Sequence, residues 1–263
     1  MTQIHRTAVI EEGAKLDEGV EIGPFTVIGP EVHIGARTVV GPHCVIQGDT
    51  VIGSDNRFHQ AVSVGDVPQD LKFSGEPSKV RIGNHNTVRE FVTIHKGTKG
   101  DQMVTTLGDH NLLMVGAHMA HDVQVGNHCI LANNVALAGH VWVDDYAIIG
   151  GLSAVHQFVR IGAHAMVGGA SAVANDVPPF LTVLGNRAVA QGLNLVGLRR
   201  RKFPRETINA IRDAFEILYR SQLPQAEALE RVRQELPDLP EIRTFLTFLD
   251  ASTRGIVRCV DCV

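Results

Sequence analysis

A six-residue period runs through most of the chain. A large, usually aliphatic side chain recurs at every sixth position from Ile4 to Val64, and glycine often follows it. The period resumes for three positions from Ile82 and for twelve positions from Leu107 to Val173. Few architectures accommodate such a repeat, so it limits the possible folds more strongly than any other feature of the sequence.

The period matches neither the 3.6-residue turn of an α-helix nor the two-residue alternation of a half-buried strand. It is typical of hexapeptide parallel β-helices, in which one apolar side chain per hexad points into a narrow prism. Three hexads form one coil, and coils stack about 4.8 Å apart, so residues three hexads apart lie above one another. Aromatic residues make up only 5% of the chain, which suits a narrow core of small aliphatic side chains. We therefore predict a mainly β protein built on a parallel β-helix.

Two segments interrupt the period, residues 66–80 and 97–106. Solenoid proteins usually place their specialised chemistry in such excursions, while the coils provide a rigid frame. The repeat ends near Pro178 and Pro179, because consecutive prolines cannot donate ladder hydrogen bonds. We therefore expect a β-helix domain over residues 1–185, with loops at both interruptions.

The rest of the chain follows a helical pattern. Apolar residues fall at helical spacing in residues 204–220, and further helical segments follow at 224–236 and 240–251. We expect a helical domain over residues 186–263 that covers the last coil, because the open end of a β-helix leaves backbone donors and acceptors without partners. This part is also basic: it holds 13 of the 24 Lys and Arg residues but only 10 of the 28 Asp and Glu residues.

Several classes of protein do not fit the sequence. No run of about 18 apolar residues predicts a transmembrane segment, and the N-terminus does not resemble a signal peptide, so we expect a cytoplasmic protein. Cys259 and Cys262 form a single CxxC without a second ligand pair, which favours a tolerated tail over a zinc or redox site. We expect neither a cofactor nor a nucleic-acid partner.

Residues 117–140 concentrate the polar residues that carry chemistry. They contain four histidines and one acid: His118, His121, His128, His140 and Asp122. Stacking by three hexads places Gly139 above His121 and Gln157 above Gly139. His128 and His164 fall elsewhere on the coil, where we expect them to face solvent.

Two chemistries suit histidines on one face of a β-helix. A metal site, as in hexapeptide-repeat carbonic anhydrases, needs imidazoles that converge on one point, yet the residue above His121 is a glycine. Acyl transfer needs a histidine as general base and a backbone N–H that stabilises the oxyanion. His121 with Asp122 would supply the base, and Gly139 the N–H. The pattern favours acyl transfer and leaves the metal site as an alternative.

Several longer segments match one known family. They are QDLKFSGEPS (69–78), VREFVTIHKGT (88–98), DHNLLMVGAHMAHD (109–122), CILANNVALAGHVWVDDYAIIGG (129–151), VHQFVRIGAH (155–164) and STRGIVR (252–258). Through these segments the chain resembles, over nearly its whole length, the acyl-(acyl-carrier-protein)–UDP-N-acetylglucosamine O-acyltransferases of lipid A biosynthesis. The resemblance implies a left-handed parallel β-helix of hexapeptide repeats with a C-terminal α-helical domain. It also implies a homotrimer with active sites between subunits.

The resemblance implies a specific activity as well. A 3-hydroxyacyl group would move from acyl carrier protein to the 3-hydroxyl of UDP-N-acetylglucosamine, the first step of lipid A biosynthesis, without metal. Two alternatives stay open: a same-fold enzyme that acylates a 3-amino UDP-sugar, because the same base and oxyanion donor serve either nucleophile, and the carbonic anhydrase-like protein.

The resemblance also assigns roles to individual residues. His121 would be the general base, Asp122 its partner and Gly139 the oxyanion donor. Residues that would contact the sugar, the nucleotide or the donor are Gln69, Asp70, Lys72, His95, His118, His140, His156, Gln157, Asn194, Arg200 and Arg201. Gly169 matches the position that sets acyl length. The chain departs from the family at Val196, where a glutamate is common, so one hydrogen-bond acceptor near the nucleotide is missing.

Overall fold

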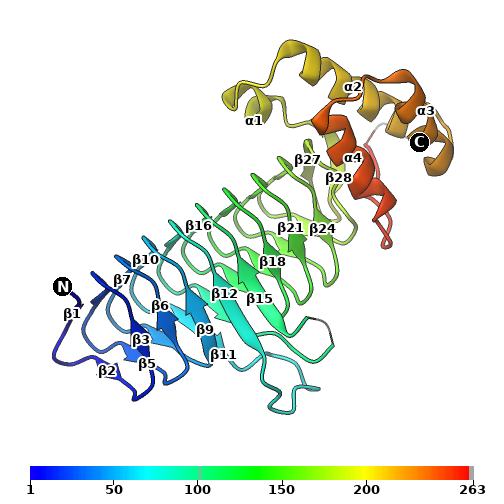
Figure 1. Ribbon diagram of the computed structural model, residues 1–263. Coiled ribbons are helices and arrows are strands. Elements are labelled where there is room, and N and C mark those ends of the chain that lie inside the picture. The colour runs from blue at the N-terminus through cyan, green and yellow to red at the C-terminus, as the bar shows by residue number, and fades with distance from the viewer. Residues whose placement is uncertain (101, 261–263) are drawn as a thin grey trace.

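The computed structural model describes residues 1–100 and 102–260 (Figure 1). Within these residues the chain winds into the left-handed parallel β-helix that the hexads and the resemblance predicted, and the three faces of the prism are three sheets. Asp101 and Cys262, which belong to the predicted second loop and the CxxC pair, lie outside the described residues.

Short strands make up each face. The first sheet contains, in spatial order, β1 (Gln3–Ile4), β4 (Glu21–Ile22), β7 (Val39–Val40), β10 (Arg57–Phe58), β13 (Thr87–Val88), β16 (Leu112–Leu113), β19 (Ile130–Leu131), β22 (Ile148–Ile149), β25 (Met166–Val167), β27 (Leu181–Leu184) and β28 (Val189–Leu193). The second contains β2 (Val9–Ile10), β5 (Val27–Ile28), β8 (Val45–Ile46), β11 (Ser63–Asp66), β14 (Thr93–His95), β17 (His118–Met119), β20 (Ala136–Leu137), β23 (Ala154–Val155) and β26 (Ala172–Val173). The third contains β24 (Arg160–Ile161), β21 (Trp142–Val143), β18 (Gln124–Val125), β15 (Val104–Leu107), β12 (Lys79–Ile82), β9 (Asp49–Ile52), β6 (His33–Ile34) and β3 (Lys15–Leu16).

Strand register follows the hexad count. His118 of β17 pairs with Ala136 of β20, and Met119 pairs with Leu137, three hexads later. Below β17 the pairing runs from Thr93 to His118, because the second excursion adds residues between these two coils. Stacking by three hexads therefore holds where the histidine cluster lies.

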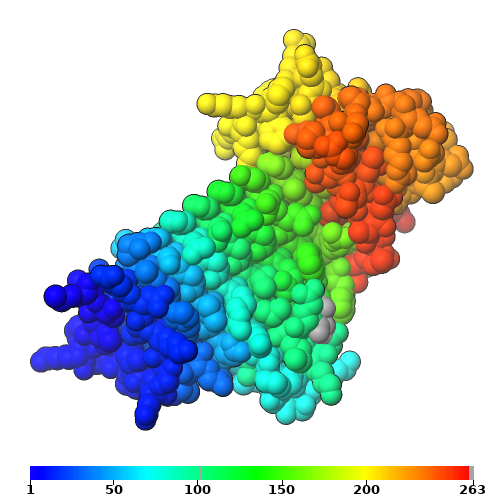
Figure 2. Space-filling model, viewed as in Figure 1, coloured from blue at the N-terminus to red at the C-terminus, as the bar shows by residue number. Residues whose placement is uncertain are grey.

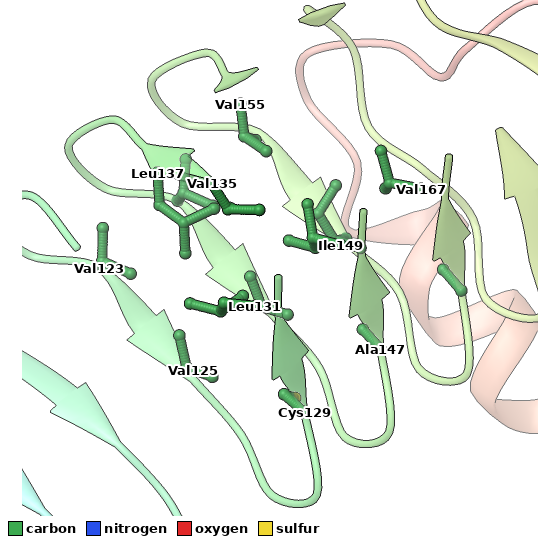
Figure 3. Packing of buried hydrophobic residues seen from close by; sticks show 14 of the residues in the cluster. Val123, Val125, Cys129, Leu131, Val135, Leu137, Ala147, Ile149, Val155 and Val167 are labelled. Atoms are coloured by element: carbon green, nitrogen blue, oxygen red, sulfur yellow. The ribbon is translucent and has the colours of Figure 1, made fainter. Parts of the chain in front are cut away.

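The hexad residues form the core of the prism. Leu131, Leu137 and Ile149 have no exposed surface. Figure 3 shows them in the interior of the prism, Leu131 and Leu137 from one coil and Ile149 from the next. Burying one such side chain contributes about 1.5–3 kcal/mol to the stability of the fold, and each further coil adds similar contributions. The first coil is the exception, because Ile4 is 48% exposed where no earlier coil covers it.

Both excursions project from the side of the prism, at the cyan-to-green stretch of the ribbon (Figure 1). β12 begins at Lys79 and β15 at Val104, so strand residues extend into the ends of both predicted loops. At the far end of the prism β28 turns back antiparallel on β27. This hairpin crosses residue 185, and the division into two domains at that residue stays a prediction.

The helices lie at the C-terminal end of the prism, opposite the N-terminus (Figures 1 and 2). Their bounds are α1 (Leu195–Arg200), α2 (Arg205–Arg220), α3 (Gln225–Glu235) and α4 (Pro240–Asp250). The helical spacing predicted the last three but not α1, which is too short to show a period. None of the helices in residues 1–100 and 102–260 has the length and apolarity to cross a membrane.

The tail after α4 returns to the prism. Ile256 forms a bridge with Asp176, and Cys259 forms one with Ala190. The backbone N–H of Asp176 donates to the carbonyl of Gly255 at 3.0 Å. The tail therefore supplies partners to backbone groups at the end of the β-helix, as expected of a cap.

Candidate active site

His121 and Asp122 lie at a corner of the prism and form a hydrogen-bonded pair. The His121 Nδ1 atom lies 3.0 Å from Asp122 Oδ2. Asp122 has a φ of 59°, and the corner residues of the next two coils, His140 and Phe158, share this left-handed conformation. The tight turn lets the Asp122 side chain fold inward, where it has no exposed surface.

This pairing defines the protonation of the imidazole. An ionised carboxylate can only accept, so the His121 Nδ1 atom carries the hydrogen, and Nε2 keeps its lone pair. His121 is 6% exposed, and its exposed part borders a cleft. An imidazole that points Nδ1 at a carboxylate and Nε2 away from it has the arrangement of a general base.

Gly139 lies directly over the His121 ring. A Cβ atom placed on Gly139 would lie 2.6 Å from His121 Nε2, so no larger residue fits without displacing the base. In the described residues no acceptor lies within hydrogen-bond reach of the Gly139 N–H. Stacking by three hexads thus brings a base and a backbone donor together, as the sequence predicted.

Two further histidines border His121. The ring of His140 stands edge-on to that of His121, with 5.0 Å between centroids, and stacks on Phe158 at 4.5 Å. His118 Nδ1 lies 2.7 Å from the hydroxyl of Thr93. Burial lowers the pKa of His118 to about 4, helped by the neighbouring His95 and His121. His118 is therefore an uncharged hydrogen-bonding group at neutral pH.

His95 lies beside His118, with 5.0 Å between the ring centroids. Burial lowers the pKa of His95 below its ordinary value, although the carboxylate of Asp66 opposes the shift. Its Nδ1 atom is buried and has no hydrogen-bond partner among residues 1–100 and 102–260. Leaving such an atom without a partner is costly in a folded protein, so a water molecule or a bound ligand would supply one.

A cleft of about 600 Å³ opens in front of His121 and His140. It is lined by Gln69, Asp70, Lys72, Glu76, Thr98, Lys99, Gly100, His121, His140, Gln157 and Phe158. A second hollow of about 290 Å³ adjoins it, with alanines at positions 120, 136, 138 and 154 and with His118 and Gly139 in its wall. The polar cleft and the apolar hollow meet at His121, and together they suit a polar acceptor and an alkyl chain.

Nine of the sequence-predicted residues do not line this cleft. Four of them surround His121 as described above, namely His95, His118, Asp122 and Gly139, and five others remain. His156 is exposed, and its Nδ1 atom lies 2.8 Å from the guanidinium of Arg254 in the tail. Gly169 is also exposed, one coil above Gly151. The other three are on or beside α1: Asn194, Arg200 and Arg201.

Two of these three side chains, those of Asn194 and Arg201, already make contacts within their own chain. Asn194 caps α1, with its Oδ1 atom accepting from Gly197 N–H at 3.0 Å and its Nδ2 atom donating to His164 O at 2.9 Å. The Arg201 guanidinium lies 4.9 Å from the centroid of the Tyr146 ring, and burial lowers its pKa.

The prediction that His164 faces solvent is wrong. His164 is half-buried between the stacked rings of Tyr146 and Phe180, and Phe203 meets it edge-on. Burial lowers its pKa to about 4. His128 does face solvent, and its ring stacks on Tyr146 at 4.7 Å in the same column.

His121, Asp122 and His140 are also a set of potential metal ligands. Ligand atoms of His121, Asp122 and His140 lie within 4.8 Å of one another. Both carboxylate oxygens, however, accept hydrogen bonds from Thr98, and one also contacts His121 Nδ1. A cation on the carboxylate would have to displace these donors, so the residues fit a hydrogen-bonded dyad better than a metal centre.

The sequence did not predict five residues of the cleft: Glu76, Thr98, Lys99, Gly100 and Phe158. Thr98 and Glu76 lie in the excursions, where no period predicts which side chains turn inward. Phe158 lies one coil above His140, so stacking by three hexads would have found it.

Comparison with known proteins decides between the alternatives. Residues 105–139 match the model of the bacterial transferase hexapeptide repeats, and residues 176–257 match that of the second domain of UDP-N-acetylglucosamine O-acyltransferase. The acyl-(acyl-carrier-protein)–UDP-N-acetylglucosamine O-acyltransferase of Thermodesulfovibrio yellowstonii is 49% identical over 258 residues, which cover 98% of this chain and 100% of that protein. The chain belongs to this family.

Solved structures of family members have the same fold. The enzyme of Acinetobacter baumannii superposes with a TM-score of 0.95 at 44% identity, covering 97% of this chain and 99% of that one. The UDP-N-acetylglucosamine acyltransferase of Francisella novicida gives 0.96 at 40% identity, covering 99% and 95%. The family membership of the chain disfavours the carbonic anhydrase-like alternative.

Proposed function

We propose that this protein transfers a 3-hydroxyacyl group from acyl carrier protein to the 3-hydroxyl of UDP-N-acetylglucosamine, the first step of lipid A biosynthesis. The name of the Thermodesulfovibrio yellowstonii relative gives acyl carrier protein as the acyl donor and UDP-N-acetylglucosamine as the acceptor. The observation that carries the proposal is local: the Gly139 backbone lies over Nε2 of His121, while Asp122 holds Nδ1. This is the arrangement that general-base acyl transfer requires.

The reaction then runs as a single displacement. Nε2 of His121 takes the proton of the sugar hydroxyl, and the oxygen attacks the thioester carbon to form the new C–O bond. The Gly139 N–H stabilises the oxyanion of the tetrahedral intermediate, and Asp122 stabilises the imidazolium of His121. The C–S bond then breaks, and the imidazolium returns its proton to the departing thiolate of the carrier.

Other residues of the cleft would bind the substrates. Gln69, Asp70 and Lys72 come from the first excursion and face His121 across the cleft. His118, in the wall of the apolar hollow, and His95 beside it offer uncharged polar atoms. We assign the alanine-lined hollow to the acyl chain, because alkyl groups favour apolar walls.

We further propose a cytoplasmic homotrimer. Cys44, Cys129 and Cys259 are free thiols, as is usual in a reducing compartment. The assembly would complete the site, because Asn194, Arg200 and Arg201 do not line the cleft of their own chain. In a ring of identical subunits, these residues would reach the cleft of a neighbour.

The test is a transfer assay with purified protein, 3-hydroxyacyl carrier proteins of several chain lengths, and UDP-N-acetylglucosamine or its 3-amino analogue. We expect the hydroxyl acceptor to be used, and His121→Ala to lose about 10²- to 10⁴-fold in rate. His128→Ala, which removes an exposed histidine outside the cleft, is the matched control. Near-normal transfer by folded His121→Ala, or transfer that a chelator abolishes, would disprove this mechanism.

A further inference from the structure

Thr98 holds the carboxylate of Asp122 through its backbone N–H and its hydroxyl. Its N–H lies 3.1 Å from Oδ1 and 3.0 Å from Oδ2 of Asp122, and its hydroxyl donates to Oδ2 at 2.6 Å. Thr98 is 4% exposed and comes from the second excursion, outside the hexad register. We propose that Thr98 is a positioning residue that orients the Asp122 carboxylate toward His121; this inference rests on the proposed function.

The backbone around Thr98 is built for this contact. A Cβ atom placed on Gly97 would lie 2.7 Å from Asp122 Oδ1, so only glycine lets the excursion close over the carboxylate. The backbone N–H of Asp122 is held separately, by the hydroxyl of Thr105 at 2.9 Å. Thr105 therefore fixes the main chain of Asp122, and Thr98 fixes its side chain.

The carboxylate needs such a constraint because it has two basic neighbours. Oδ2 lies 3.0 Å from Nδ1 of His121 and 3.9 Å from Nε2 of His140. The terminal torsion of an aspartate is broad, so packing alone does not select between them. The Thr98 hydroxyl approaches Oδ2 more closely than either imidazole does, and so holds that oxygen beside His121. If the carboxylate turned toward His140, Nδ1 of His121 would lose its partner and with it the tautomer that makes Nε2 a base.

Thr98→Val tests the hydroxyl alone, because valine keeps the shape and the backbone N–H. We expect kcat for transfer to fall about 10- to 100-fold, the usual effect of one hydrogen bond to a charged group, with KM for UDP-N-acetylglucosamine changed less than about twofold. Thr98→Ser should restore most of kcat. Thr38→Val is the matched control, because Thr38 is also buried and its hydroxyl donates to Gly53 O at 2.9 Å, far from the cleft.

A double-mutant cycle separates positioning from a general structural role. If Thr98 acts through Asp122, Thr98→Val should cost almost nothing further in the Asp122→Asn background. The inference is overturned if the two losses multiply, if Thr98→Val keeps wild-type kcat, or if Thr98→Ser fails to recover. Thr98→Ala enters the same cycle should the valine variant not fold. A wild-type protein without transfer activity would instead overturn the proposed function.

Discussion

At the residue scale, burial divides the histidines by their acid–base behaviour. His118 beside the base and His164 in the ring column both have a pKa lowered to about 4. For His164 the main cause is desolvation, and the nearby Arg201 adds to it. Its Nδ1 atom is buried and has no hydrogen-bond partner in the part of the chain that the structure describes. A proton on this ring would therefore be costly in the folded state.

This cost predicts an acid-dependent loss of stability. Because the folded pKa lies below the ordinary value of about 6.5, the unfolded chain binds more protons between about pH 6.5 and 4. Stability from these histidines is thus present above that window and lost as the pH falls through it. We expect His164→Phe, which keeps a ring between Tyr146 and Phe180, to lose less Tm than wild type between about pH 7.5 and 5. Transfer at about pH 7.5 should be unchanged, because His164 does not line the cleft.

Thermal unfolding at the two pH values gives the measurement. His128→Phe is the control, because it alters an exposed ring of the same column and should keep the wild-type pH dependence. Equal slopes for wild type and His164→Phe would show that burial of His164 does not contribute.

Sequence could predict only those residue contacts that follow the coil. Adding three hexads to His121 gave Gly139, because backbone register alone decides which residue lies above another. The stacking of His164 on Tyr146 follows the same rule, but Phe203, which also covers its ring, lies beyond the repeat, so the coil alone did not reveal that His164 is half-buried. Thr98 was equally hidden, because its contact with Asp122 depends on how an irregular loop folds back.

At the scale of elements, Glu76 joins the two excursions. Its carboxylate accepts from the N–H of Lys99 at 3.1 Å and from the N–H of Ser74 at 2.9 Å. Hydrogen bonds from backbone N–H groups lower its pKa to about 2, so it stays ionised throughout the neutral range. The loop that carries Gln69 and Lys72 is thereby tied to the residue that follows Thr98.

Glu76→Gln should loosen this tie, because an amide has one acceptor oxygen where the carboxylate has two. We expect KM for UDP-N-acetylglucosamine to rise about 3- to 10-fold, with kcat affected less than by Thr98→Val. Amide hydrogen exchange in residues 67–78 should become faster. Glu31→Gln, an exposed glutamate of an early coil, provides the control. An unchanged KM together with unchanged exchange would mean that the two loops hold their places independently.

The elements themselves were partly predictable. Breaks in the hexads predicted both excursions, but not that β12 and β15 begin within them. Strand pairing explains why β12 begins earlier than the hexads indicate. Lys79 pairs with both Asp49 and Val104, although its own side chain is exposed and polar. Hydrogen bonds of the main chain extend these strands, and no side-chain pattern reports them.

At the scale of the whole molecule, one chain supplies only part of the predicted substrate contacts. Gln69, Lys72 and His121 share a cleft, whereas Arg200 is an exposed residue of α1 outside it. The sequence could not reveal this separation, because α1 follows a hairpin whose direction the repeat does not specify. If Arg200 binds the nucleotide, it does so in the cleft of a neighbouring subunit.

Mixed trimers test this arrangement. His121→Ala and Arg200→Ala should each be nearly inactive, but chains unfolded and refolded together should recover activity. An active site needs an intact His121 from one subunit and an intact Arg200 from its neighbour. With random mixing in equal amounts, about a quarter of the sites meet this condition, so about a quarter of wild-type activity is expected. Mixing His121→Ala with Asp122→Asn is the control, because both changes damage the same half of the site and no recovery should follow. Failure of the first mixture to recover would place Arg200 in the cleft of its own chain or outside the reaction altogether.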